Sequence, residues 1–145
     1  MMIRKLDDQN GLKTYAVIRG TGDEVMACLE DFARAEGIDG AELSAIGAFR
    51  RASLLYFDWE RKEYDETPVD EQVEVASLNG DIGVDERCAP APHVHVVLGR
   101  RDGSALAGHL KSGEVRPTLE VIVTETPSHL RRAHDATTGL ALIRI

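Results

Sequence analysis

The stretch PHVHVVLGRRDGSALAGHL, residues 92–110, predicts a β-hairpin, and the rest of the fold can be built outward from it. Apolar residues alternate with other residues on both sides of segment 101–103, as they do in strands that bury one face. That segment ends in Asp-Gly, a pair favoured in tight hairpin turns. We therefore predict strands over residues 93–99 and 104–109, joined by a turn.

The register of this hairpin decides where its three histidines point. His93 and His95 are two residues apart, so they project from the same face of their strand. A three-residue loop, with Gly103 in the left-handed conformation, would place His95 directly opposite His109 and His93 on the diagonal. A two-residue loop would shift the pairing by one residue and turn His109 to the other face. The site hypothesis depends on the three-residue loop.

Three imidazoles on one face of a hairpin form a candidate metal site. Directly opposed residues have Cβ atoms about 5 Å apart and diagonal neighbours about 7–8 Å, so the rings can share an ion. Three histidines with an open fourth position are typical of Zn²⁺ and related divalent transition-metal sites, where the ion activates water or polarises a carbonyl. The alternative is three partly buried or surface histidines without a metal. His129 and His134, in the polar segment 127–137, are predicted to be surface residues.

Glu120 is the carboxylate that we add to this candidate site. In the predicted strand 117–125 it lies with Thr118 on the less apolar face, because the residues that alternate with it are Leu119, Val121 and Val123. It is a candidate fourth ligand, an outer partner that orients one histidine, or a general acid or base. The alternative is a solvated strand carboxylate.

One helix is predicted, over residues 22–36. Thr21 with Glu24 three residues later forms a capping box, and Gly37 supplies the stop. After the helix the apolar period changes from 3.6 to 2, which predicts strands, with a bulge or bend at Gly47.

The remaining strands complete the fold class. They are predicted at residues 14–19, 40–58, 62–66 (closed by Pro68), 73–78 with an extension over 81–84, and 138–144, with a loop at 85–92. Together these elements predict an α+β fold, a single domain over residues 1–145. One main helix packs on a largely antiparallel or mixed sheet of seven or eight strands, which can roll toward a barrel.

Composition limits the partners and the compartment. Lys and Arg number 17 against 25 Asp and Glu, the net charge is −8, and no basic run reaches five residues, so direct nucleic-acid binding is not expected. The sequence contains neither a signal-peptide pattern at its start nor an apolar run near the ~18–20 residues of a membrane span, so we expect a cytoplasmic protein. Cys28 and Cys88 form no C-x-x-C pair, which argues against a zinc-thiolate site.

Several motifs resemble one known family. They are Ala45–Ala48, Val75–Ile82, Pro92–His95, Asp102-Gly103, Ala107–Leu110 and Thr118–Val121. In type and spacing they are similar to the plants-and-prokaryotes conserved (PPC) domain, over residues 12–145. The resemblance implies a compact fold with a mixed or antiparallel sheet, assembly as a homotrimer, and a histidine set that matches His93, His95 and His109.

The resemblance also suggests two functions. Plant members of the family couple this domain to an AT-hook that grips the DNA minor groove, and bacterial members are often labelled DNA-binding by analogy. This sequence has no Arg-Gly-Arg-Pro core, so the DNA-gripping part is missing. We predict a trimeric domain with a three-histidine metal site, which binds a small molecule or supports metal-assisted chemistry; no sequence motif decides whether it is an enzyme. The alternative is a regulatory protein that acts in DNA-associated complexes through oligomerisation and protein contacts.

Overall fold

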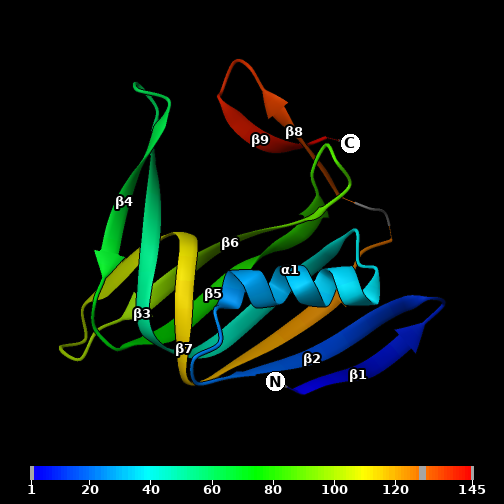
Figure 1. Cartoon of the computed structure of the whole chain (residues 1–145), viewed down its shortest axis with the longest axis horizontal. Helices are drawn as coiled ribbons and strands as arrows, with labels where there is room; N and C mark the ends of the chain where they lie inside the picture. Colours follow the sequence, from blue (N-terminus) through cyan, green and yellow to red (C-terminus); the bar gives the residue numbers. More distant parts are fainter. Residues whose placement is uncertain (1, 128–129, 145) are drawn as a thin grey trace.

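A nine-stranded sheet with one helix packed on it makes up the computed structural model, which describes residues 2–127 and 130–144 (Figure 1). The fold is a compact, mostly β domain. Its sheet has nine strands, whereas seven or eight were predicted. In chain order the elements are β1 (Met2–Gln9), β2 (Leu12–Gly20), α1 (Val25–Glu36), β3 (Ala41–Asp58), β4 (Glu63–Val69), β5 (Val73–Val84), β6 (Pro90–Gly99), β7 (Ala105–Glu125), β8 (Arg131–Asp135) and β9 (Leu140–Arg144).

The centre of the sheet closes on itself. β3 pairs with both β5 and β7, and β6 pairs with the same two strands, so these four strands form a closed circuit of antiparallel pairs. β2 and β1 extend the sheet from β7, and β4 pairs only with β3 among the described strands. Bulges in β3, at the predicted Gly47 among other places, let the long strands bend around the circuit.

Strand alternation decides which side chains enter the core. In β6, Val94, Val96 and Leu98 are buried. His93 and His95 alternate with these residues and therefore face outward. α1 covers the other side of this core with its apolar stripe, which consists of Val25, Leu29, Phe32 and Ala33. The histidines thus stand on a strand whose opposite face is fixed by close packing.

The helix begins at Val25, three residues later than predicted, and the predicted capping box is wrong. Glu24 is the N-cap: its carboxylate accepts the backbone N–H groups of Met26 and Ala27. Residues 21–22 form a turn and Glu24 is extended, because this segment attaches to β7: Glu24 pairs with Glu114, and the Thr21 hydroxyl donates to the carbonyl of Pro117. Gly37, with φ 68°, ends the helix as predicted. No helix of the described chain is long and apolar enough to cross a membrane.

Several strand predictions need correction. β7 is one strand of 21 residues, whereas the sequence indicated separate strands at 104–109 and 117–125. β1 and β8 were not predicted, and β6 begins at Pro90, inside the predicted loop. Pro68 does not close β4 but pairs with Ser53 inside it, which an edge strand tolerates because the missing N–H can face away from the partner.

Two hairpins project from the same side of the sheet, β3–β4 and β8–β9 (Figure 1). Their turns meet: a Cβ atom built on Gly139 would lie 3.7 Å from the Cβ atom of Lys62. The β8–β9 hairpin joins the main sheet through a single rung, between Val84 and Arg131. The space between the two hairpins lies beside the outward face of β6.

Candidate metal centre

The turn between β6 and β7 has the three-residue form on which the site depends. The backbone N–H of Arg100 donates to the carbonyl of Ser104 at 2.8 Å, so these two residues close the hairpin. Gly103 has φ +84°, the left-handed conformation that this loop requires. The resulting register pairs His95 directly with His109, as predicted.

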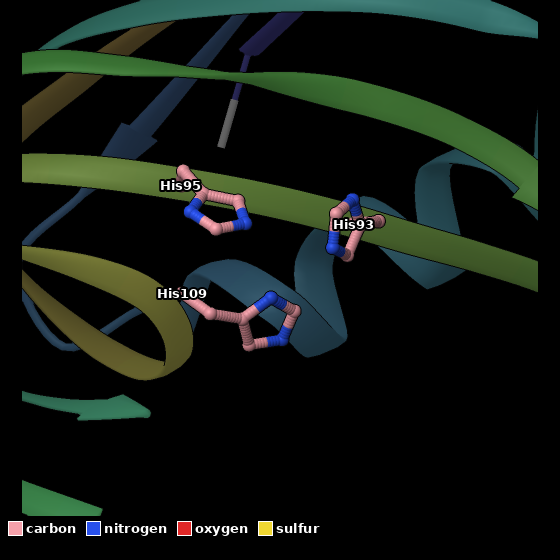
Figure 2. A group of neighbouring side chains, drawn as sticks. All are labelled: His93, His95 and His109. Atoms are coloured by element: carbon pink, nitrogen blue, oxygen red, sulfur yellow. The ribbon is translucent and has the colours of Figure 1, made fainter. Parts of the chain in front are cut away.

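The three imidazoles converge in space (Figure 2). The ring centroid of His93 lies 5.2 Å from that of His95 and 4.9 Å from that of His109, and the remaining pair is 5.4 Å apart. One nitrogen from each ring can be chosen so that all three lie within 4.8 Å of one another. Two rings come from β6 and one from β7, so adjacent strands of one hairpin supply the whole set.

The environment keeps two of these rings neutral. Burial is the main cause that lowers the pKa of His109 to about 4, with smaller contributions from His93, His95 and Arg132. Burial also lowers the pKa of His93, assisted by Arg132 and opposed by Asp81. Near pH 7 both rings therefore keep an unprotonated nitrogen, which is the form that binds metals.

The donor set fits a metal ion. The Nδ1 atom of His109 is buried and has no hydrogen-bond partner among residues 2–127 and 130–144. A buried polar nitrogen without a partner costs about 1–3 kcal/mol, so such atoms usually mark a bound ion, an ordered water or a functional site. Three convergent imidazoles, one with an unused buried nitrogen, match the ligands that Zn²⁺ and similar ions prefer.

Two charged residues that sequence reasoning missed lie beside the cluster. Asp81 Oδ2 is 4.0 Å from Nδ1 of His93, because the two residues pair across β5 and β6. Nη2 of Arg132 donates to both carboxylate oxygens of Asp81, at 2.8 and 2.6 Å. The pairing of β5 with β6 is the signal that could have found Asp81. No comparable signal exists for Arg132, which lies in the unpredicted strand β8.

A cavity of about 730 Å³ opens onto the histidines. One wall belongs to the β3–β4 hairpin, where the ring centroid of Tyr64 lies 5.9 Å from that of His109. The other wall belongs to the β8–β9 hairpin, which contributes Arg132, Leu140 and Leu142. A mostly apolar cavity with a few convergent polar groups is typical of small-molecule sites.

Glu120 is not brought to this cluster. It is exposed and pairs with Ile46 of β3, whereas His109 pairs with Leu55, nine residues further along the same strand. At ~3.3 Å per residue, this is a separation of roughly 30 Å along the strand. Alternation in the sequence therefore indicated the face of the strand on which Glu120 lies, but not its distance from the histidines along the sheet. His134 is exposed, as predicted, and His129 lies outside the described residues.

Solved structures share this fold over almost the whole chain. A metal-containing protein from Archaeoglobus fulgidus is 36% identical, with a TM-score of 0.85 over 92% of this chain and 94% of that one. A protein of Bacteroides thetaiotaomicron, described as a "putative DNA binding protein", is 28% identical, with a TM-score of 0.89 over 99% and 98% of the two chains. A plant- and prokaryote-conserved protein of Pyrococcus horikoshii is 30% identical, with a TM-score of 0.85 over 99% and 95%.

A family model and a further relative each match most of the chain. The bifunctional protein GlmU of Synechococcus sp. (strain JA-3-3Ab) is 26% identical over 137 residues, which are 92% of this chain but 21% of that protein. The chain therefore spans about a fifth of that relative's length. The family model of the Plants and Prokaryotes Conserved (PCC) domain matches residues 6–127. With the hairpin, the sheet and the histidines in place, the chain belongs to the PCC domain family, as its sequence motifs indicated.

Proposed function

We propose that this protein binds one divalent transition-metal ion through His93, His95 and His109, with Zn²⁺ the best match, and uses the site to bind a small molecule or to support metal-assisted chemistry. The observation that carries the proposal is the buried, unpartnered Nδ1 of His109 within a set of three convergent imidazoles. The metal-containing relative from Archaeoglobus fulgidus, 36% identical over 92% of this chain, supports it. When bound, the ion supplies a Lewis-acidic position at the floor of the cavity.

The residues of the chain have separate tasks in this proposal. The three histidines hold the ion, and the packed side of β6 keeps their backbone in place. Asp81 faces His93 and favours one orientation and tautomer of its ring, as carboxylates beside metal-binding histidines do. The apolar walls limit water in the cavity, which strengthens electrostatic interactions inside it.

Metal content is the direct test. Untagged protein purified without added metal should contain about one Zn²⁺ or similar ion per chain by elemental analysis. The double variant His93→Ala/His95→Ala should lose the ion, while His134→Ala, an exposed histidine away from the cluster, should keep it. Finding no metal, together with unchanged stability on addition of Zn²⁺, would contradict the proposal.

We also propose that the protein assembles as a homotrimer, the state implied by the family resemblance. Large apolar side chains on the sheet face away from α1 support self-association: Ile46 is 61% exposed and Ile122 is 42% exposed. Light scattering should give a mass about three times the 15.9 kDa of one chain. A mass near 15.9 kDa would refute the trimer without affecting the metal site.

A further inference from the structure

The β8–β9 hairpin brings a charge to the cavity that metal binding alone does not use. Arg132 lines the cavity with the histidines, and its side chain is 10% exposed. Nη1 and Nη2 donate to Ala141 and Asp81, but the buried Nε has no hydrogen-bond partner in the described part of the chain. A guanidinium offers five N–H donors in a planar fork, so Arg132 retains donors for a ligand.

The charges around the site do not balance once an ion is bound. Asp81 offsets Arg132, and imidazole ligands carry no negative charge, so the two charges of a divalent ion remain uncompensated. The described residues that line the cavity include no carboxylate. A charge beside apolar walls is unfavourable unless it is paired, which favours an anionic ligand at the open position.

The side chains that line the cavity indicate the chemical character of the part of the ligand that does not bind the metal. The apolar residues that line the space next to the histidines include Leu55, Phe57, Tyr64, Pro92, Leu140 and Leu142. Aromatic and aliphatic surfaces of this kind favour a ligand with an apolar body. The volume of about 730 Å³ admits a molecule with one ring or a short chain together with its head group.

We infer that the cavity binds a small organic monocarboxylate, with its carboxylate between the histidine-bound metal and Arg132 and its apolar body between the two hairpins. This inference rests on the proposed metal site and goes further by naming the ligand class. A carboxylate fits better than a phosphate ester, because one guanidinium with two nitrogens already engaged offers few donors to a dianion with three oxygens. The β8–β9 hairpin that supplies Arg132 lies beyond residues 6–127, which the family model matches.

The test uses the full-length protein loaded with Zn²⁺, after its zinc content has been measured. Benzoate is titrated by calorimetry and compared with benzyl alcohol, benzylamine, acetate and phenyl phosphate. We expect benzoate to bind about tenfold or more tightly than each of the others, since a charge-assisted hydrogen bond and an apolar ring act together. In Co²⁺-loaded protein, benzoate should also change the visible absorption spectrum, because its carboxylate enters the metal's coordination shell.

Two variants test the contact with the carboxylate and the contact with the apolar body of the ligand separately. Arg132→Gln should weaken benzoate binding about tenfold or more at unchanged zinc content, whereas Arg131→Gln, an exposed neighbour that does not line the cavity, should bind like the parent. Because Arg132→Gln also leaves Asp81 unpaired, Leu140→Ala provides an independent test: it should weaken benzoate binding several-fold and leave acetate binding unchanged.

The outcomes distinguish the two proposals. A protein with full zinc content that does not bind benzoate, or that binds phenyl phosphate more tightly, overturns the carboxylate inference and leaves the metal site standing. Equal losses in Arg131→Gln and Arg132→Gln would also overturn it. A protein that takes up no zinc overturns both.

Discussion

Replacing His109 by leucine should stabilise the metal-free protein and remove the stabilisation by metal. The buried Nδ1 of His109 has no partner in the described chain, and an unsatisfied buried polar atom costs about 1–3 kcal/mol. Since His109 is only half-buried, we expect the lower end of this range, about 1 kcal/mol, to be recovered in His109→Leu. In the parent protein, free Zn²⁺ at 100 times its Kd should add about 2.7 kcal/mol.

Urea unfolding with and without chelator measures both effects. The order of the free energies of unfolding should reverse between the two buffers: His109→Leu is more stable than the parent in chelator and less stable in Zn²⁺. His134→Leu, at an exposed position, should stay within about 0.5 kcal/mol of the parent in both buffers. A His109→Leu variant that is less stable than the parent even in chelator would refute the reasoning, because the orphaned nitrogen would then not be a source of instability.

Three further outcomes follow from the site and its surroundings. In chelator, the free energy of unfolding should fall as the pH drops from 6.5 toward 4. The reason is that the unfolded chain binds a proton at His109 in this range, while burial lowers the pKa of His109 in the folded protein to about 4. In a pH series of urea melts, His109→Gln should show a smaller decrease over the same range. Gly80→Ala should disrupt the pairing of β5 with β6 and abolish zinc uptake in calorimetry, since the added Cβ would lie 2.1 Å from the carbonyl oxygen of His93; unchanged uptake would show that the strands can separate without moving the site. With a net charge of −8, the protein should not retard duplex DNA in gels even at low salt, and retardation that disappears as salt is raised would favour the DNA-associated alternative.

The hairpin was predictable because its determinants are local. Alternation along β6 and a Gly103 that can adopt positive φ indicated the hairpin and left two registers; the three-residue turn closed by Arg100 and Ser104 gives the one in which His95 contacts His109. The helix stop at Gly37 and the bulge at Gly47 were predictable for the same reason, since each depends on a few neighbouring residues.

The features that were missed depend on contacts between distant segments. Asp81 reaches His93 only because β5 and β6 are neighbours in the sheet. Arg132 lies on a hairpin that is held by one rung, an ion pair with Asp81, the hydrogen bond from the backbone N–H of His134 to Glu86 and the contact of its turn with the β3–β4 turn. Glu120 shows the converse error: alternation gives the face of a residue, whereas its distance from a site depends on how two long strands are aligned. The start of α1 was misplaced because attachment to β7 competed with a local capping motif.

The single-rung attachment of the β8–β9 hairpin has a consequence for ligand preference. The metal-binding floor is backed by the domain's close-packed core, whereas the Arg132 wall is a short appendage joined to the sheet at Val84 and Arg131. No described residue of this hairpin belongs to the buried core, so substitutions at hairpin positions other than Arg132, whose partner Asp81 also faces His93, should cost the core little folding energy. Substitutions in this one hairpin can therefore change the ligand preference of the protein while its three histidines stay in place on β6 and β7.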